Sequence, residues 1–208
     1  ILDEIKSRYI FEIIIVDDCS TDQSKKVYSK FSFEENINIL YNKKNMGQSY
    51  SLRKGMLSSK YETVLTIDGD GQNNPKDIPN LIEKFFSDNF LLLVSGIRIE
   101  RKDSLSKIIA SKLANTIRST ILRDKCKDTG CSLKVFNKKI FLDFEYFNGI
   151  HRFIPSLFEG FGHKVHYINV NHRKRLKGKS NYNNTQRLFK GINDIIRVRK
   201  ILNSANKN

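Results

Sequence analysis

Two carboxylates spaced two residues apart form the strongest chemical signal in the sequence. Asp68 and Asp70 follow the apolar run 63–67, alternate with glycines, and precede the amide oxygen of Gln72. Oxygen donors at this spacing suit a divalent cation. Asp and Gly are also common turn residues, so an ordinary turn explains the same letters. The context favours a site, because Pro75 opens a predicted helix directly after the turn.

A second acidic pair, Asp17 and Asp18, ends the β-branched apolar run 11–16. Such a run is typical of a buried parallel strand. Ligands of parallel sheets gather at the carboxyl ends of the strands, so we expect both acidic pairs to face one crevice. The alternative for Asp18 is that it only caps the helix that follows.

The elements that would position these acids alternate between strand and helix along the chain. This pattern predicts an α/β domain with a mainly parallel sheet flanked by helices. The predicted strands are 11–16, 37–41, 63–67, 90–95, 133–136 and 164–170. The predicted helices are 22–31, 48–58, one that begins at Pro75, 103–122, 151–160 and 184–202.

The composition fits one folded domain and excludes several other classes of protein. The chain has 208 residues, 39% of them hydrophobic, and three Cys that form no Cys-x-x-Cys pair, which argues against disorder and a disulfide framework. No apolar run reaches the roughly 18 residues of a membrane-spanning helix. Residues 151–208 contain 13 Lys and Arg but 2 Asp and Glu. This asymmetry favours an anionic partner: nucleotide phosphates, lipid head groups or nucleic acid.

Six motifs carry a resemblance that covers nearly the whole chain. They are IVDDCSTD at 15–22, NMG at 45–47, LTIDGDGQNNP at 65–75, GIR at 96–98, DTGCSLKVF at 128–136 and HRKRLKGKSNY at 172–182. In this order they resemble the family 2 glycosyltransferases with a GT-A fold, most closely the dolichol-phosphate mannose synthase-like, polyprenyl-phosphate branch. Each motif alone is weak, but six in the family's order make chance a poor explanation.

The resemblance implies an inverting glycosyltransferase that uses a nucleotide-sugar donor. Asp68, Asp70 and Gln72 would hold Mg²⁺ or Mn²⁺ against the donor diphosphate, where the cation offsets charge on the leaving group. Asp17 or Asp18 would bind the base or the ribose of the nucleotide.

Basic residues would complete the implied site. Arg98 would reach a phosphate at the same crevice, although a solvated arginine is the alternative. In the basic loop before the last predicted helix, Arg175, Lys177 and Ser180 would contact phosphates, because guanidinium offers a bidentate fork. A solvated run of charge is the alternative for this loop. Asp70, Arg98 and Arg175 are thus the residues implied to act in transfer.

The acceptor that the resemblance implies is a polyprenyl phosphate. A phosphate monoester is ionised at neutral pH, so its oxygen can attack the anomeric carbon without a general base. The sequence accordingly has no Gln-x-x-Arg-Trp motif of the hydroxyl-acceptor branches, and no Trp. Asp128 would position sugar hydroxyls, or would belong to a plain turn. We expect mannose from GDP-mannose, with a UDP-sugar donor as the alternative.

A non-catalytic basic module that binds nucleic acid or membrane is the rival hypothesis. It explains the charge of the C-terminal part, but it gives no reason for acidic clusters at two strand ends. Those acids would repel a polyanion unless a metal were bound. We therefore expect an enzyme, with no nucleic-acid partner.

The end of the chain predicts a membrane contact. We expect residues 1–182 to form the glycosyltransferase domain and 183–208 a basic amphipathic helix and tail. This helix would lie on the cytoplasmic face of a membrane, or pack on the domain core. The family normally begins with one further strand and an acidic nucleotide-binding turn, so we expect the first strand of the fold to be lacking. Asn181 stands where a Lys commonly follows the loop serine.

Overall fold

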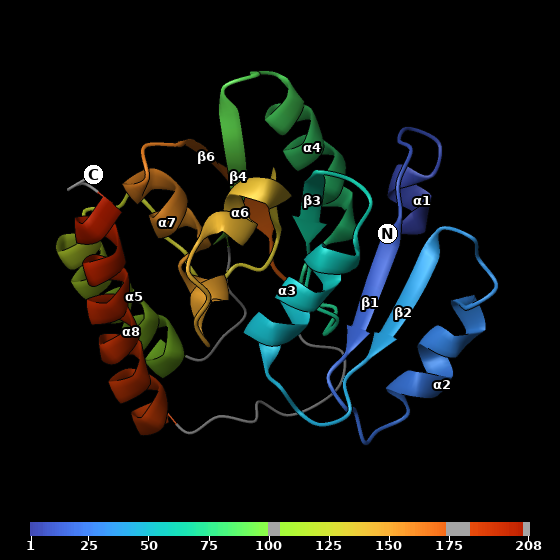
Figure 1. Ribbon diagram of the computed structural model, residues 1–208, viewed down its shortest axis with the longest axis horizontal. Helices are drawn as coiled ribbons and strands as arrows, with labels where there is room; N and C mark the ends of the chain where they lie inside the picture. Colours follow the sequence, from blue (N-terminus) through green and yellow to red (C-terminus); the bar gives the residue numbers. More distant parts are fainter. Residues whose placement is uncertain (100–104, 174–183, 206–208) are drawn as a thin grey trace. The chain divides into compact units, whose positions relative to one another are not determined.

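The computed structural model describes residues 1–99, 105–173 and 184–205, which form two compact units (Figure 1). Unit 1 consists of Ile1–Val64 and Asn137–His151. Unit 2 consists of Leu65–Phe136 and Arg152–Asn208. The two units are described separately below, with the elements that cross their boundary under unit 2.

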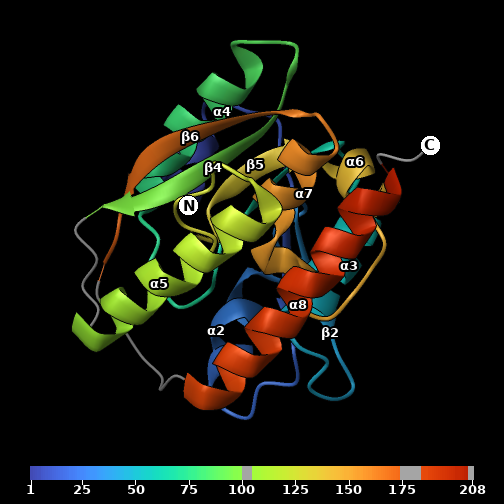
Figure 2. The ribbon, with the colours of Figure 1, turned by 90° about the vertical axis from the view of Figure 1, so that its left-hand side faces the viewer.

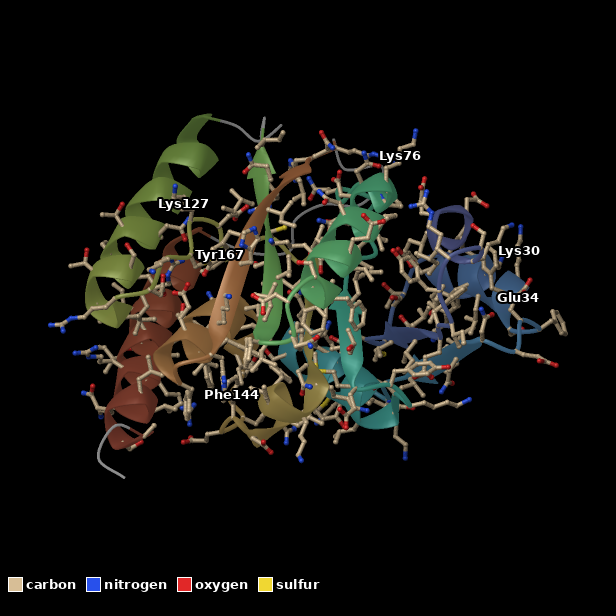
Figure 3. All side chains as sticks on the ribbon, turned by 90° about the horizontal axis from the view of Figure 1, so that it is seen from above. Lys30, Glu34, Lys76, Lys127, Phe144 and Tyr167 are labelled. Atoms are coloured by element: carbon tan, nitrogen blue, oxygen red, sulfur yellow. The ribbon has the colours of Figure 1, made fainter. Side chains whose placement is uncertain are left out.

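Unit 1 is built on a two-stranded parallel sheet of β1 (Ile13–Asp17) and β2 (Ile37–Tyr41). Three isoleucines and a valine form most of β1, and their branched side chains favour the extended backbone. Side chains of the segment between the two strands, such as Lys30 and Glu34, project outward from this unit (Figure 3). The helical elements are α1 (Leu2–Ile5), α2 (Ser24–Tyr28), η1 (Ser29–Phe31), α3 (Gln48–Ser58) and α6 (Lys138–Asp143).

Unit 2 contains most of a four-stranded mixed sheet in the order β3-β5-β4-β6. The strands are β3 (Thr63–Thr66), β4 (Leu91–Ile99), β5 (Lys134–Asn137) and β6 (Lys164–Asn171). β4 is parallel to β6 and antiparallel to β5. The sheet is therefore only partly parallel, because the chain enters β5 from the opposite end.

Helices and large apolar side chains enclose this sheet. The helical elements are η2 (Pro75–Asp77), α4 (Ile78–Phe86), α5 (Leu105–Leu122), η3 (Ile150–Arg152), α7 (Ile154–Gly160) and α8 (Asn184–Ala205). The rings of Phe136 and Phe158 meet edge to face, with centroids 5.9 Å apart. Helices α5 and α8 run side by side (Figure 2). None of the helices in the described part of the chain is long and apolar enough to cross a bilayer.

The structure confirms most predicted elements and corrects two. β2 and α3 have the predicted bounds. The prediction that the fourth strand ends at residue 95 is wrong, because β6 pairs with β4 as far as Ile99, so Arg98 lies within the strand. The segment 1–10 is interpreted from its sequence as the tail of a helix, and α1 lies within it. The helix α6 was not predicted. Asn137 caps α6 by accepting a hydrogen bond from the Ile140 N–H at 3.2 Å, a signal present in the sequence.

Helix α8 packs on the core of unit 2. Ile195, Val198 and Leu202 are buried. A Cβ atom added at Gly160, the last residue of α7, would lie 2.5 Å from Leu202 Cδ2. The two helices can approach this closely only because Gly160 has no side chain. The alternative in which the last helix packs on the domain core is thus observed.

We expect Gly160→Ala to lower the free energy of unfolding of unit 2 by about 1–3 kcal/mol, because overpacking displaces Leu202. Gly191→Ala is the matched control, since Gly191 lies within α8 and a Cβ there meets nothing within 4 Å. That control should raise stability by roughly 0.5–1 kcal/mol through helix propensity. Urea denaturation followed by circular dichroism measures both. Equal effects of the two substitutions would contradict close packing at Gly160.

Candidate active site

The acidic turn of unit 2, residues 68–72, is bound at its start by the hydroxyl of Ser132. The Asp68 N–H donates to Ser132 Oγ at 3.1 Å, and Thr66 Oγ1 donates to the Ser132 carbonyl at 2.6 Å. The Gln72 N–H donates to Asp70 Oδ1 at 3.1 Å, which closes the turn. The predicted turn is therefore present, and it is fixed to the segment that precedes β5.

The electrostatics of this turn combine burial, like charge and nearby cations. Burial raises the pKa of Asp68, and the charge of Asp70 raises it further. The Ser132 hydroxyl and the charges of Lys134 and Arg98 act in the opposite direction. Lys134 is 2% exposed, and its ammonium donates to the Cys131 carbonyl. Two carboxylates and two cations thus influence one another at this end of the sheet.

The donor atoms of the turn fit a hard divalent cation. Asp68 and Asp70 supply carboxylate oxygens whose mutual repulsion a cation would relieve. The amide nitrogen of Gln72 faces His172 and the Arg173 carbonyl, which puts its oxygen on the other side of the amide. Among the described residues no group of three His, Cys, Asp or Glu side chains is arranged to hold a metal. Two carboxylates and an amide would therefore need oxygens from a bound ligand.

Arg98 forms an ion pair with Asp128 that the sequence did not indicate. Arg98 Nε donates to Asp128 Oδ2 at 2.8 Å, and Nη2 donates to Oδ1 at 2.8 Å. The Arg98 backbone N–H donates to Oδ2 as well, at 3.1 Å. The two side chains are 14% and 6% exposed. The fork of Arg98 therefore holds a carboxylate of the same unit, while its contact with a phosphate stays a prediction.

The end of β6 is joined to the acidic turn by a set of contacts that begins at Gln72. Gln72 Nε2 lies 3.3 Å from His172 Nε2, and the Arg173 N–H donates to the Gln72 carbonyl at 2.8 Å. Asn73 and His172 form an isolated antiparallel bridge. His172 is buried. It lies 100 residues after Gln72 in the sequence, so no local pattern indicated that the two side chains are in contact.

A second set of contacts joins the end of β6 to Asn74 and Asp77, which follow the acidic turn in the sequence. Both the N–H and the side-chain amide of Asn171 donate to the Asp77 carboxylate, each at 2.8 Å. Arg173 Nη2 donates to Asn74 Oδ1. The start of the basic loop is therefore fixed to the segment that carries the acidic turn. Arg175, Lys177 and Ser180, with Asn181, lie outside the described residues.

In unit 1, the carboxylate of Asp18 holds the loop between β2 and α3. It accepts hydrogen bonds from the Met46 N–H at 2.7 Å, the Gly47 N–H at 2.8 Å and Asn42 Nδ2 at 2.8 Å. Burial raises the pKa of Asp18, but these hydrogen bonds outweigh it and hold the pKa below its usual range. Asp18 thus organises the NMG motif, whatever it contacts in a complex.

Asp17 is the last residue of β1, and its side chain turns back onto its own loop. It is 4% exposed, and its Oδ1 accepts a hydrogen bond from the Ser20 N–H at 3.0 Å. Burial raises the pKa of Asp17, whereas hydrogen bonding by Ser20 and the charge of Lys25 lower it below its usual range. The predicted binding of a base or ribose by Asp17 or Asp18 stays a prediction.

Comparison with known proteins identifies relatives of similar sequence. The model of a family described as Glycosyl transferase family 2 matches residues 1–144. The dodecaprenyl-phosphate galacturonate synthase of Rhizobium johnstonii is 34% identical over 193 residues, which cover 90% of this chain and 56% of that protein. The undecaprenyl-phosphate 4-deoxy-4-formamido-L-arabinose transferase of Pectobacterium carotovorum is 31% identical, covering 83% and 53%. The chain spans about half the length of these curated relatives.

Solved structures with the same fold confirm the predicted fold class, GT-A. Mannosyl-3-phosphoglycerate synthase from Rubrobacter xylanophilus superposes with a TM-score of 0.70 at 14% identity, covering 100% of this chain and 70% of that one. Glucosyl-3-phosphoglycerate synthase from Mycobacterium tuberculosis, in complex with Mn²⁺ and UDP-glucose, superposes with a TM-score of 0.68 at 14% identity, covering 95% and 72%. At this identity the likeness concerns the fold alone.

We expect Asp18→Asn to destabilise unit 1 at pH 7 by about 1–3 kcal/mol, because an amide cannot accept all three hydrogen bonds. The folded pKa of Asp18 is lowered, so its contribution is complete above the unfolded pKa of about 3.9 and is lost as pH falls through the folded pKa. The difference from the unsubstituted chain should therefore shrink in acid. Urea denaturation at several pH values tests this, with the exposed Asp143→Asn as control. A difference that did not vary with pH would argue against a charged Asp18.

Proposed function

Since this chain belongs to glycosyl transferase family 2, we propose that it transfers a sugar from a nucleotide-sugar donor to a polyprenyl phosphate. The observation that carries the proposal is that the acidic turn, Asp68 and Asp70, is bound through Ser132 to the segment that carries Lys134 and Asp128, the partner of Arg98. Such a site can bind a diphosphate through a metal and a second phosphate through a guanidinium. The names of both curated relatives describe polyprenyl-phosphate glycosyl transfer, which supports this acceptor class.

The reaction we propose is a single displacement with inversion. An ionised acceptor oxygen forms a bond to the anomeric carbon while the bond from that carbon to the donor diphosphate breaks. Bound at Asp68, Asp70 and Gln72, Mg²⁺ or Mn²⁺ would supply Lewis-acid stabilisation of the leaving diphosphate. Arg98, held by Asp128, would orient the attacking phosphate. No side chain needs to remove a proton, because the acceptor is already ionised at neutral pH.

The sugar is the finer part of the proposal. We retain mannose from GDP-mannose as the first donor, on the resemblance of the motifs. The relatives' names give galacturonate and 4-deoxy-4-formamido-L-arabinose instead of mannose. A UDP-sugar therefore stays the alternative donor and is tested equally. Asp17 and Asp18 are proposed to contact the nucleoside, Asp18 through the loop that it organises.

We also propose that the enzyme works peripherally at the cytoplasmic face of a membrane, where a polyprenyl acceptor is held. The observation is a set of exposed isoleucines on the neighbouring helices α5 and α8: Ile117, Ile121, Ile192 and Ile196. Arg199 and Lys200 on α8 add positive charge beside them. An apolar strip with basic neighbours suits anionic lipid head groups.

The test of the function is a donor screen on the purified chain. GDP-mannose, UDP-glucose and UDP-galacturonic acid are each supplied with Mg²⁺ or Mn²⁺ and a short polyprenyl phosphate, and lipid-linked sugar is measured by mass spectrometry. The same polyprenol without its phosphate is the matched control acceptor. We expect transfer to the phosphate alone. Transfer to the polyprenol, or transfer without a divalent metal, would overturn the proposal.

Within that screen, Asp70→Ala should abolish transfer and the metal-dependent binding of UDP or GDP, because one carboxylate leaves the cation under-coordinated. The fold should survive, since Asp70 lies in a turn at the surface of the sheet end. Calorimetry with the nucleotide in the presence and absence of Mn²⁺ measures the loss, and Asp143→Ala is the control for removing an exposed acid. Metal dependence that persisted in Asp70→Ala would remove this residue from the metal site.

For the basic loop, we expect Arg175→Ala to cost about 2–4 kcal/mol of transition-state stabilisation, since it removes a charge-assisted bond to phosphate. Arg175→Lys should recover only part, because an ammonium keeps the charge and loses the fork. Lys139→Ala, an exposed cation on α6, should change little. Steady-state kinetics at saturating metal separates them. Small, similar effects that fade with salt would instead indicate a general basic field.

A further inference from the structure

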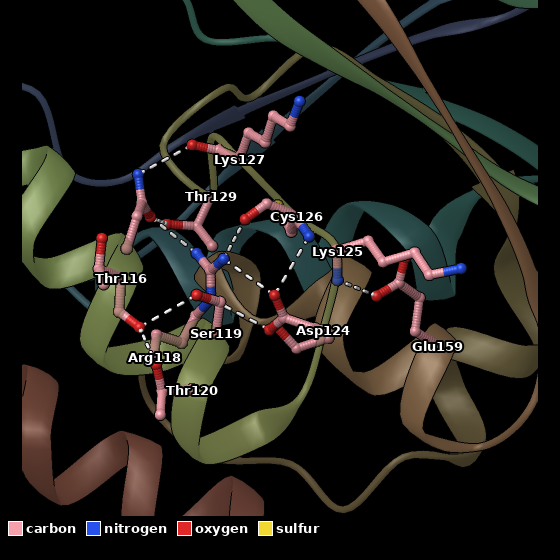
Figure 4. A network of polar contacts seen from close by, with 12 residues as sticks. Thr116, Arg118, Ser119, Thr120, Asp124, Lys125, Cys126, Lys127, Thr129 and Glu159 are labelled. Atoms are coloured by element: carbon pink, nitrogen blue, oxygen red, sulfur yellow. Dashed lines mark hydrogen bonds and ion pairs between the residues drawn. The ribbon is translucent and has the colours of Figure 1, made fainter.

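Arg118 is a buried arginine for which the proposed reaction has no direct use. It lies near the C-terminal end of α5 and is 3% exposed. Its Nε and Nη2 donate to the two oxygens of Asp124 at 3.0 and 2.9 Å, as Figure 4 shows. Nη2 also donates to the Cys126 carbonyl, and Nη1 donates to Asn115 Oδ1 at 2.7 Å. All three nitrogens of the guanidinium are therefore engaged.

The partners of Arg118 extend its hold along the segment 124–129. Asn115 Nδ2 donates to the Lys127 carbonyl at 3.0 Å, and Asn115 Oδ1 accepts from Thr129 Oγ1 at 3.3 Å. Asp124 Oδ1 accepts from the Cys126 N–H at 3.1 Å. The contacts thus reach residues on both sides of Asp128, as the dashed lines of Figure 4 show for this segment.

Ser156 and Glu159 of α7 secure the start of the same segment. Ser156 Oγ donates to Asp124 Oδ2. The Lys125 N–H donates to Glu159 Oε2 at 2.7 Å, and Tyr167 of β6 donates to Glu159 Oε1 at 3.0 Å. The segment is therefore tied to α5 and α7 and, through Glu159, to β6. Near its other end, Asp128 forms the ion pair with Arg98.

Stability of the fold does not by itself call for this arrangement. An apolar set of the same volume often stabilises a core as well as a buried ion pair does, because desolvation offsets the attraction between the charges. What a planar guanidinium adds is direction, since each N–H fixes one acceptor in place. Here the fixed acceptors are the backbone and side chains that flank Asp128.

We propose that Arg118 is a positioning residue: it fixes the segment 124–129, thereby sets the Asp128 carboxylate, and through it aims the guanidinium of Arg98. The inference rests on the proposed function in one respect, namely that Arg98 orients the acceptor phosphate. The positioning of Asp128 and Arg98 by Arg118 does not depend on which reaction the enzyme catalyses.

Two variants test the proposal on the full chain. Arg118→Lys keeps the charge and loses the fork. Asn115→Ala removes the bonds to Lys127, Thr129 and Arg118 Nη1, while Arg118 keeps its ion pair with Asp124. Leu122→Ala is the matched control, because Leu122 is buried on the same helix at 5% exposure and takes no part in the polar contacts. It reports what simple loosening of α5 does.

The first measurement is hydrogen exchange of the Arg98 Nε–H by ¹⁵N NMR, with the signal assigned by its loss in Arg98→Lys. We expect exchange to be faster in Arg118→Lys and Asn115→Ala than in Leu122→Ala, because a less firmly held Asp128 carboxylate exposes the Nε–H to water more often. The second measurement is steady-state transfer. The KM for polyprenyl phosphate should rise about tenfold in the two test variants, with the KM for the donor unchanged.

The outcomes separate this proposal from the proposed function. If the unsubstituted chain transfers no sugar, the proposed function fails, and the exchange of the Arg98 Nε–H alone decides whether Arg118 positions Arg98. Unchanged exchange in Asn115→Ala, or an equal effect of Leu122→Ala, would overturn the proposal. Should Arg118→Lys fail to fold, Asn115→Ala still decides.

Discussion

The ion pair between Arg98 and Asp128 determines how charge is arranged in unit 2. Removing a guanidinium and a carboxylate from water costs several kcal/mol for each ion, so the pair persists only with well-formed hydrogen bonds. Arg98 supplies two side-chain donors and its backbone N–H. Gly130 makes the approach possible, because a Cβ atom there would lie 2.6 Å from Arg98 Nη2. The position of Asp128 and Gly130, in the segment before β5, therefore determines where the Arg98 guanidinium of β4 lies.

The acidic turn depends on the same neighbourhood. Arg98 and Lys134 both act on Asp68, and Ser132 binds its backbone. These groups are fixed before any ligand arrives, so their dipoles and charges need little reorganisation when charge develops. A polyanion alone would meet two carboxylates, Asp68 and Asp70, and be repelled. A diphosphate bound with a divalent cation suits both signs of charge, which is why the enzyme proposal accounts for more of the site than a basic binding module does.

The sequence was sufficient for the elements but not for the pairings among side chains. Periodicity and turn residues located β2, α3 and the turn at Asp68, because these are decided by residues close together along the chain. The pairing of Arg98 with Asp128 spans 30 residues and depends on the antiparallel entry of β5, which no local pattern encodes. Likewise, the residue type of Asp18 indicated a polar role, whereas its actual contacts with Met46 and Gly47 come from how a distant loop folds over it. The short helix α6 lacked a strong apolar period, and only its cap at Asn137 could have revealed it.

Residues 151–208 are strongly basic, whereas residues 1–150 carry 24 Lys and Arg against 20 Asp and Glu. The two parts of the chain meet where β6 ends. Asn171 binds Asp77, and His172 and Arg173 contact Gln72, so the strand that leads into the basic loop is fixed to the acidic segment itself. Arg173 itself brings a positive charge to the acidic segment, because its N–H donates to the Gln72 carbonyl and its Nη2 donates to Asn74 Oδ1. Long-range attraction is not required to bring the two signs of charge together. Hydrogen bonds of Asn171 and Arg173 to the segment 72–77 do so before any ligand binds. The charges of Arg173 and of the acidic turn can then act on the same ligand.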